Sequence, residues 1–240
     1  MPRINVGQVS MGRLIGSAQG DATATTLTIA VVIPASMAFL HIGISSQDSN
    51  DAVLPITGVT VNGSSSGVVK AIETLGNPND TVSSVWYKLS PDAGSYNVVI
   101  STSGSTYKAA VVSWWSGVIA QAPEATAGSS GTAASVALPI TALSNYAVVI
   151  DTASHKGAYS SISNGQTLVG TEAGQSFEHV TVTYKEVNAG ATTMGQQWGS
   201  SNSFSDSAIA LAPTVNIIQR TVATIGSRTV ATIGSRTIAT

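Results

Sequence analysis

Residues 84–117 read Ser-Val-Trp-Tyr-Lys-Leu-Ser-Pro-Asp-Ala-Gly-Ser-Tyr-Asn-Val-Val-Ile-Ser-Thr-Ser-Gly-Ser-Thr-Tyr-Lys-Ala-Ala-Val-Val-Ser-Trp-Trp-Ser-Gly. Three runs of apolar and β-branched residues are separated here by two polar segments that contain glycine, 91–94 and 102–105. Such runs predict strands and such segments predict tight turns, so we expect three antiparallel strands in succession. Three of the four tryptophans lie in this stretch. Because tryptophan buries a large apolar area, the stretch predicts the centre of the core.

The rest of the chain continues this pattern. Short strand-like runs alternate with turn signals at even intervals, and no long stretch keeps a helical period. This spacing is typical of an all-β fold, and we predict an antiparallel β-sandwich. Further strands are expected at 23–33, 37–45, 56–61, 67–73, 134–138, 146–152, 167–172, 179–185, 192–198 and 208–212.

Three segments of different character divide the chain. Residues 1–22 contain recurring glycines without a sustained apolar period, which predicts an extended N-terminal arm. Residues 23–213 are the expected sandwich body, and 214–240 are a tail with its own repeat. The Pro-, Ala- and Gly-rich segment 122–131 could separate two halves of the body. We expect it to be a long loop within one sandwich instead, because neither half alone offers a full set of strands.

The tail contains a repeat of eight residues. Arg-Thr-Val-Ala-Thr-Ile-Gly-Ser occurs at 220–227 and again at 228–235, and a partial copy follows. Glycine at the first turn position suits a two-residue hairpin, which predicts a meander of three short strands. Alternatively, an even repeat keeps the same faces along one extended strand. In either form the ribbon is too small to be stable alone, so we expect it to need a partner surface.

Positive and negative charges are segregated along the chain. The five arginines all lie in the terminal segments, at Arg3, Arg13, Arg220, Arg228 and Arg236. All five lysines and all twelve acids lie between Asp21 and Asp206. This favours docking of a basic arm on an acidic body, with a chance pattern in a charge-poor chain as the alternative. Widely spaced arginines without interleaved aromatics are a poor phosphate-binding patch, so no nucleic-acid partner is expected.

The composition excludes several classes of protein. Only 9% of the residues are charged, which is unusual for a cytosolic enzyme and suits a subunit whose surface is covered by neighbours. The chain has no cysteine, so it has neither disulfides nor a thiolate metal site. No apolar run reaches the roughly 18 residues of a membrane helix, and the N-terminus lacks the apolar core of a signal peptide. We therefore expect no membrane span and no secretion through a cleaved signal.

Six segments of the body carry a resemblance to a known module. They are Phe39-Leu-His-Ile-Gly-Ile-Ser-Ser-Gln-Asp48, Val59-Thr-Val-Asn-Gly63, Trp86-Tyr-Lys-Leu-Ser-Pro-Asp-Ala-Gly-Ser-Tyr-Asn-Val98, Trp115-Ser-Gly-Val118, Tyr146-Ala-Val-Val-Ile-Asp151 and Ala208-Ile-Ala-Leu-Ala-Pro213. With these segments the chain resembles a β-sandwich module of bacterial secreted proteins and phage virion proteins. The resemblance implies a lectin-like or jelly-roll sandwich and no particular reaction. The repeat tail and the missing signal favour the virion members.

Few residues point to bound ligands or catalysis. His41 lies in an apolar run, which predicts a hydrogen-bonded core residue rather than a metal ligand. Asp48, Asp51 and Asp80 lie in loops that could supply oxygen ligands to one Ca²⁺. Asx-rich turns also satisfy their own backbone, so we predict no metal and no cofactor. The chain contains no Gly-x-Ser-x-Gly elbow, and no catalytic residue is expected.

Trp114 and Trp115 are neighbours in one predicted strand. Because side chains alternate between the two faces of a strand, one indole is expected to point into the core and the other outward. The outward indole would be a sugar-stacking platform or would lie under a neighbouring subunit, and we favour the subunit.

Together these patterns predict a non-enzymatic structural subunit of a phage-like virion, such as a capsid decoration protein, a head or tail fibre, or a related appendage. Its partners would be copies of itself and other virion proteins, assembled in the host cytoplasm. The alternative is a carbohydrate-binding module or adhesin of an extracellular filament or cell surface, with a glycan as partner. The residues expected to join subunits by strand addition and ion pairs are Arg3, Arg13, Arg220, Val222, Ile225, Arg228, Val230, Ile233, Arg236 and Ile238.

Overall fold

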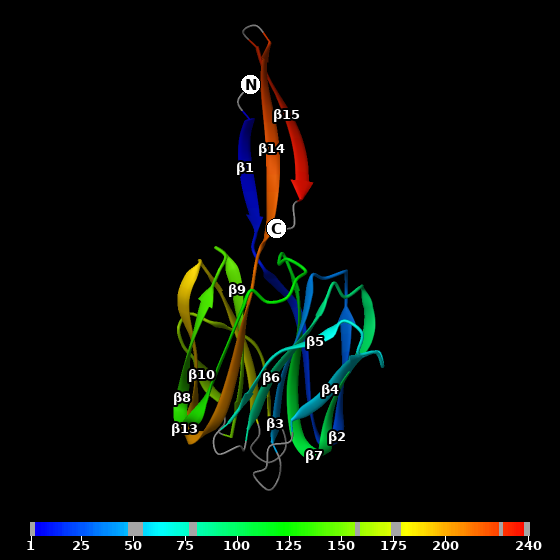
Figure 1. Cartoon of the computed structure of the whole chain (residues 1–240), viewed down its shortest axis with the longest axis vertical. Helices are drawn as coiled ribbons and strands as arrows, with labels where there is room; N and C mark the ends of the chain where they lie inside the picture. The colour runs from blue at the N-terminus through cyan, green and yellow to red at the C-terminus, as the bar shows by residue number, and fades with distance from the viewer. Residues whose placement is uncertain are drawn as a thin grey trace.

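The computed structural model describes the backbone of residues 3–47, 55–76, 81–156, 159–173, 179–225 and 228–237, and the side chains of all of these except 3–10, 159–160 and 215–237. Every regular element in these ranges is a β-strand, which confirms the predicted all-β class. A broad body of packed sheets carries a narrow stalk along the long axis of the molecule (Figure 1). The part of the chain that is described contains no helix long and apolar enough to cross a membrane.

Two antiparallel sheets of six strands form the body, one from each half of the chain. The first contains β2 (Arg13–Ile33), β3 (Phe39–Gln47), β4 (Ile56–Val61), β5 (Val68–Leu75), β6 (Val82–Leu89) and β7 (Gly94–Ser116). The second contains β8 (Ala125–Ala142), β9 (Ala147–His155), β10 (Tyr159–Ile162), β11 (Thr167–Ala173), β12 (His179–Val187) and β13 (Gly190–Leu211). The two sheets pack against each other, so the predicted antiparallel β-sandwich is confirmed.

The two sheets have the same strand order. The first runs β2-β7-β3-β6-β5, with β4 also paired to β7. The second runs β8-β13-β9-β12-β11, with β10 also paired to β13. Each strand of the first half therefore has a counterpart six strands later, and the body is a duplicated six-stranded unit.

Short sequence pairs mark this duplication. Asn62-Gly63 and Asn164-Gly165 follow the third strand of their halves, and all four residues have positive φ. Asn and Gly tolerate this conformation better than other residues, as the turn requires. Tyr87-Lys88 and Tyr184-Lys185 occupy the fifth strands, β6 and β12. These matches place corresponding residues at corresponding positions in the two halves.

Each sheet is folded over on itself. The pairing of β2 with β7 shifts register near Ala24, and that of β8 with β13 shifts near Gln197. Strands bend at such bulges. As a result, Val98 from the first part of β7 lies in the same buried cluster as Val112 from its second part. Each half thus encloses a hydrophobic core of its own.

A third hydrophobic core lies between the two sheets. Phe39 stacks on Tyr87 with 5.1 Å between ring centroids, and Trp115 meets Tyr184 edge-on at 5.0 Å. Ile150 of the second half belongs to the same cluster. The stretch 84–117 therefore contributes to the centre of the molecule, as its tryptophans predict.

Two predicted boundaries within strands are wrong. The polar segment 102–105 is part of β7, so the two strands predicted on either side of it are one strand. It continues because β7 pairs with β2 on both sides of their register shift. In the same way, 192–198 and 208–212 both lie within β13.

The predicted loop at 122–131 and the arm at 1–22 also differ from the structure. β8 begins at Ala125, so most of the predicted loop is strand, and each half does have a full set of strands. Its small residues reflect close packing, because a Cβ on Gly128 would lie 2.3 Å from Thr74 Oγ1 of β5. β2 begins at Arg13, so residues 13–22 belong to the first body sheet.

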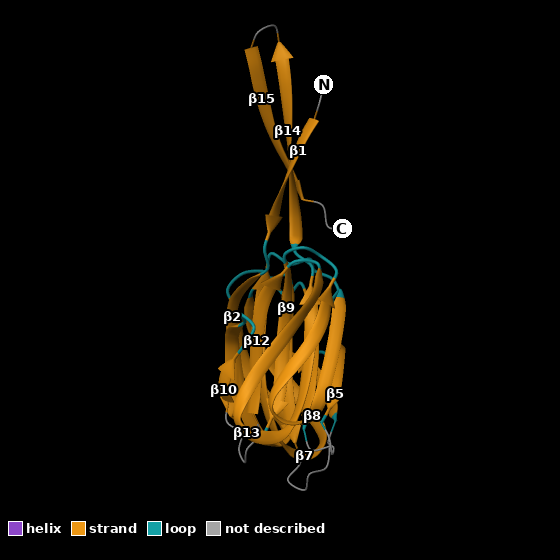
Figure 2. Cartoon of the chain, turned by 90° about the vertical axis from the view of Figure 1, so that its left-hand side faces the viewer, coloured by secondary structure: helices purple, strands orange, loops and turns teal. Residues whose placement is uncertain are grey.

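A third antiparallel sheet forms the stalk. It contains β1 (Arg3–Ser10), β14 (Thr214–Ile225) and β15 (Arg228–Thr237), in the order β1-β14-β15. Figure 2 shows this sheet standing clear of the end of the body. Segments near both ends of the chain are therefore combined in one element.

Candidate functional site

The stalk exposes two strand edges. β14 is its central strand: it pairs with β1 from Arg3↔Thr221 to Ser10↔Thr214, and with β15 over ten residue pairs. No other strand in the described ranges pairs with β1 or β15. Such edges present backbone donors and acceptors that can pair with another chain.

The octad repeat forms one long hairpin, which differs from both predicted forms. The positions of the first Gly-Ser, 226–227, separate β14 from β15 and lie outside the described residues. The second Gly-Ser lies inside β15, where Gly234 pairs with Gln219 and Ser235 with Ile218. The return strand can be this long because β14 begins at Thr214, six residues before the repeat.

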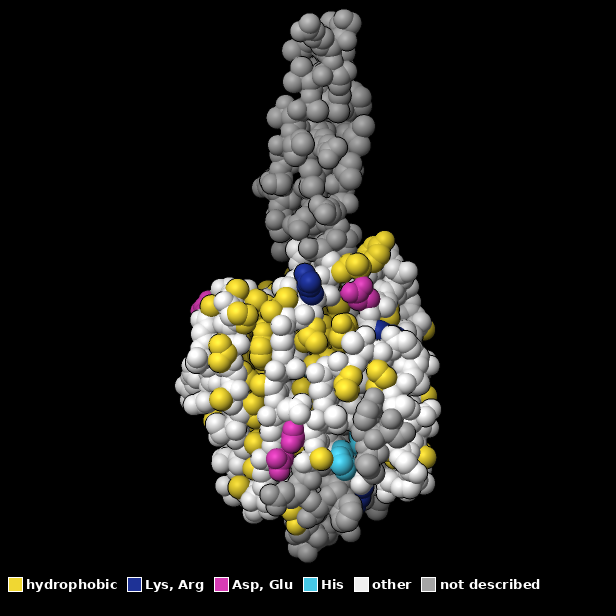
Figure 3. All heavy atoms as spheres, turned by 180° about the vertical axis from the view of Figure 1, so that it is seen from behind, with side chains coloured by type: hydrophobic (Ala, Val, Ile, Leu, Met, Phe, Trp, Pro, Cys, Tyr) yellow, Lys and Arg dark blue, Asp and Glu magenta, His cyan; other side chains and the backbone are white. Residues whose placement is uncertain are grey.

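Eight of the ten predicted assembly residues occupy the stalk strands. They are Arg3 in β1, Arg220, Val222 and Ile225 in β14, and Arg228, Val230, Ile233 and Arg236 in β15. Arg13 is instead the first residue of β2, with an exposed side chain, and Ile238 lies outside the described residues. The body face in Figure 3 carries few charged side chains. Four of the five arginines, Arg3, Arg220, Arg228 and Arg236, thus lie in the strands of the stalk.

The stalk joins the body at a closely packed neck, formed by residues 11–12, 117–119 and 212–214. The Thr214 N–H donates to the Gly117 carbonyl at 2.8 Å, and Val118 forms a bridge with Pro213. Gly117 has a φ of 71°, and a Cβ there would lie 2.2 Å from the Met11 carbonyl oxygen. Glycine alone meets both demands. The neck fixes the point at which β14 leaves the body.

Both tryptophans of the Trp114-Trp115 pair are buried, so the expectation of one outward-facing indole is not met. Trp114 is 7% exposed and Trp115 is 0% exposed. The two side chains do point to opposite faces of β7, but a core covers each face: the core of the first half for Trp114 and the core between the sheets for Trp115. Of the remaining tryptophans, Trp198 is 3% exposed, and Trp86 is half-buried with Lys70 Nζ 5.3 Å from its ring centroid.

Two of the three histidines, His41 and His155, are fully buried. His41 is fully buried, and its ring nitrogens lie 3.2 Å from Ser113 Oγ and 3.3 Å from Thr152 Oγ1, as a core residue should. Burial lowers the pKa of His41 to about 3, so the ring is neutral at pH 7. His155 stacks between His179 at 5.5 Å and Trp198 at 4.7 Å.

No metal-binding group forms in the described part of the chain: no three acidic or histidine side chains come close enough together there to hold an ion. The loop acids Asp48, Asp51 and Asp80 lie outside the described residues.

A buried carboxyl pair in the second half was not predicted. Asp151 and Asp206 are both 0% exposed. Asp151 Oδ2 accepts hydrogen bonds from Gln196 Nε2 at 2.8 Å, Thr183 Oγ1 at 3.3 Å and Gln166 Nε2 at 3.4 Å. Burial raises the pKa of both carboxyls, and the charge of Asp151 raises that of Asp206 further. The three donors favour the charged form of Asp151, so the pKa of Asp206 is the one that is raised further.

The sequence signal that could have predicted this buried pair is an acidic residue beside an apolar, strand-like run. Asp151 follows Val-Val-Ile and Asp206 precedes Ser-Ala-Ile-Ala, whereas solvated acids occur in turns. Full burial keeps any substrate from the pair, so its chemistry concerns folding.

A buried lysine occupies the first half. Lys108 is 0% exposed, and its Nζ donates to the carbonyl of Ala24, to Thr102 Oγ1 at 3.0 Å and to the Thr106 carbonyl at 3.4 Å. Burial lowers the pKa of Lys108 to about 8 from the usual 10.5. The unfolded chain therefore binds more protons than the folded one between these two values.

We expect the free energy of unfolding to rise as the pH increases from 8 to 10.5, the window between the folded and unfolded pKa values. Lys108→Met should reduce this rise, because one titrating group is gone while Lys185, whose pKa burial also lowers, remains. Urea unfolding at a series of pH values measures it. Lys70→Met, at a partly exposed site, is the matched control and should keep the rise. An unchanged slope in Lys108→Met would contradict the assignment.

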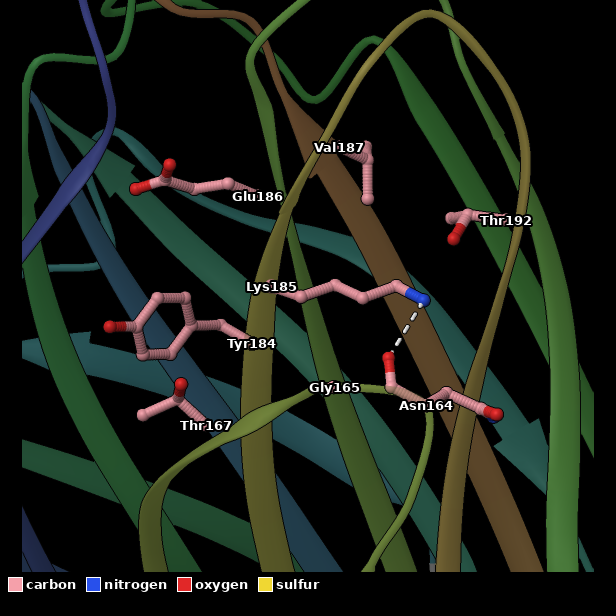
Figure 4. Close-up of a pocket in the computed structure, with 8 residues that line it drawn as sticks. All are labelled: Asn164, Gly165, Thr167, Tyr184, Lys185, Glu186, Val187 and Thr192. Atoms are coloured by element: carbon pink, nitrogen blue, oxygen red, sulfur yellow. Dashed lines mark hydrogen bonds between the residues drawn. The ribbon is translucent and has the colours of Figure 1, made fainter.

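A surface hollow of about 550 Å³ lies over β12. Figure 4 shows Tyr184 and Glu186 pointing to one side of the strand and Lys185 to the other, so its lining does not converge on one ligand. Lys185 Nζ donates to the carbonyls of Thr193 at 2.7 Å and Asn164 at 3.4 Å. Its counterpart in the first half, Lys88, likewise donates to a carbonyl between the third and fourth strands, at Ser66. Both lysines thus hold the same connection in place, which is a structural role.

Comparisons with known proteins add little to this geometry. No family model matches the chain, and no curated protein matches it. Among solved structures, the chain aligns with the C-terminal domain of the Streptococcus pyogenes antigen I/II-family protein AspA. The alignment covers 94% of this chain and 97% of that domain, at 7% sequence identity and a TM-score of 0.24. Similarity of this size supports no argument about function.

Proposed function

We propose that this chain is a non-enzymatic structural subunit of a virion-like particle that assembles with other copies through its stalk. The observation that carries the proposal is the stalk itself, a sheet of three strands drawn from near both ends of the chain, with β1 and β15 as open edges. An isolated sheet of this size is only marginally stable in water, so association through its edges provides the missing contacts.

The body supports the proposal in two ways. Its buried titratable residues have roles in the cores, and the hollow over β12 lacks a converging set of polar groups. The duplicated sandwich gives a rigid support, and the neck holds the stalk at one end of it. A rigid body with a projecting sheet whose edge strands can pair with other copies suits an appendage or decoration protein. The alternative, a glycan-binding module, loses its main residue because Trp114 and Trp115 are buried.

Removal of residues 220–240 tests the proposal. The full chain is expected to form oligomers and the truncated chain to be a monomer, because the hairpin and its edge β15 are gone. Light scattering gives the mass, and near-ultraviolet circular dichroism reports whether the body keeps its packing. Unchanged assembly of the truncated chain, or a full chain that stays monomeric at high concentration, would contradict the proposal.

A point variant repeats the test without shortening the chain. Gln219 lies in the central strand, where it pairs with Asn5 and with Gly234. Proline in a central strand removes a ladder hydrogen bond, so Gln219→Pro should also abolish assembly. Gln219→Thr is the matched control, since threonine favours strands, and it should assemble as the unmodified chain does.

A further inference from the structure

One ten-residue sequence occurs twice in the stalk in two different structures. Residues 220–229 and 228–237 both read Arg-Thr-Val-Ala-Thr-Ile-Gly-Ser-Arg-Thr. The second copy is the whole of β15, a continuous strand. The first copy ends β14 at Ile225 and begins β15 at Arg228. The local sequence is therefore compatible with both a continuous strand and a strand reversal, and it does not determine where the chain turns.

The register of the hairpin can be reproduced between two chains. Thr221 pairs with Thr232, and the pairs continue to Ile225↔Arg228. If residues 220–237 run as one strand, a second copy in the antiparallel direction supplies all of the same pairs. The first Gly-Ser, at 226–227, links β14 to β15, and in the exchanged form its two positions can pair as well. The second Gly-Ser, Gly234 and Ser235, already pairs within the sheet. Exchange of identical elements between copies is a low-cost route to association.

We propose that two copies of this chain exchange β15, so that the strand completing each stalk comes from the partner copy. This inference rests on the proposed function, because it names the way in which the stalks join. The short hairpin is favoured within one chain by its small loop. The exchanged form gains from mass action and prevails as the concentration rises.

A disulfide across the pair Thr221↔Thr232 distinguishes the two forms. The chain has no cysteine, so Thr221→Cys with Thr232→Cys introduces a single pair. Directly opposed residues in antiparallel strands have Cα atoms about 4.5–5.5 Å apart, within the range of a disulfide. After oxidation, gel electrophoresis without reductant is expected to show a covalent dimer that increases with protein concentration. Disulfides confined to single chains at every concentration would overturn the proposal.

Deletion of the link sharpens the test. Without Gly226 and Ser227, a hairpin within one chain would need Ile225 and Arg228 at its turn positions, where positive φ disfavours both residues. The two-cysteine chain is therefore expected to give a larger share of covalent dimer at each concentration. The matched control deletes Gly234 and Ser235, which leaves the link intact and removes an even number of residues. It should give the same mixture as the parent two-cysteine chain. A link-deleted chain that forms no covalent dimer would also overturn strand exchange.

The two proposals fail separately. If removal of residues 220–240 abolishes assembly while the disulfide stays within single chains, the stalk is the assembly element and intact hairpins meet edge to edge. If the truncated chain assembles as the full chain does, the stalk is not the assembly element, whatever the disulfide shows.

Discussion

Gly43→Val is expected to destabilise the body by about 3 kcal/mol or more, the upper range for overpacking in a core. Gly43 lies in β3, in the layer that faces the second half. A Cβ at this position would lie 2.7 Å from Thr152 Oγ1 and 2.9 Å from both His41 Cε1 and Val182 Cγ2. Thr152 and Val182 belong to β9 and β12, so the added methyl groups would force the two sheets apart.

Urea unfolding measures this effect, and Gly58→Val provides the matched control. Gly58 is also a strand glycine, in β4, but nothing lies within 4 Å of a Cβ added there. Because valine favours strands, Gly58→Val should be neutral or slightly stabilising. Equal unfolding midpoints for the two variants would mean that the sheets are not in close contact at Gly43.

Asp206→Asn is expected to raise the midpoint of thermal unfolding at neutral pH by several degrees and to flatten its dependence on pH. The folded pKa of Asp206 lies well above the usual 3.8, because burial and the nearby charge of Asp151 both oppose its ionisation. The folded state therefore binds more protons than the unfolded state above pH 3.8. The stability that the proton provides is complete below that pH and is lost as the pH rises through the folded pKa.

The asparagine keeps the shape of the side chain and is uncharged at every pH. Because the amide carries no charge in the folded or the unfolded chain, the variant should match the unmodified chain in acid and exceed it at neutral pH. Calorimetry between pH 4 and 8 measures the difference. Asp151→Asn is the matched control: it removes the charge that accepts three hydrogen bonds, and it should be destabilising throughout this range. A lower midpoint for Asp206→Asn than for the unmodified chain at pH 7 would contradict a raised pKa for Asp206 in the fold.

Much of the fold could be predicted from local patterns. Runs such as Phe39–Ile44, which is apolar except for His41, and Ala208–Leu211 lie in strands that are buried on both faces. The reversal at 91–94 was predicted by Pro-Asp-Ala-Gly, and β7 begins at Gly94. The other polar segment, Thr-Ser-Gly-Ser at 102–105, also consists of residues common in turns, yet it lies within β7. Turn residues permit a reversal without enforcing it, and here β7 bends but continues, because it pairs with β2 on both sides of the register shift.

The candidate site was less predictable. The repeat and the segregated arginines indicated an assembly element, yet nothing local showed that β1 would pair with β14 or that one Gly-Ser would lie within β15. The burial of Trp114 was also missed. Alternation correctly placed the two indoles on opposite faces of β7, but both faces are covered because each sheet folds over on itself.

By itself, the sequence determined the strand periodicity and the octad repeat, because both depend on residues that are close together in the chain. It also excluded disulfides, because it contains no cysteine. The tertiary structure decided how many hydrophobic cores the strands enclose and which acidic and lysine side chains are buried. It also decided between which two strands of the stalk the chain reverses direction. These features depend on pairing between distant segments: the duplicated sheets cover each other's faces, and β14 offers a partner along the whole of β15. The same ten residues therefore form one strand at 228–237 and parts of two antiparallel strands at 220–229, since the available partner strand, and not the local sequence, selects between these arrangements.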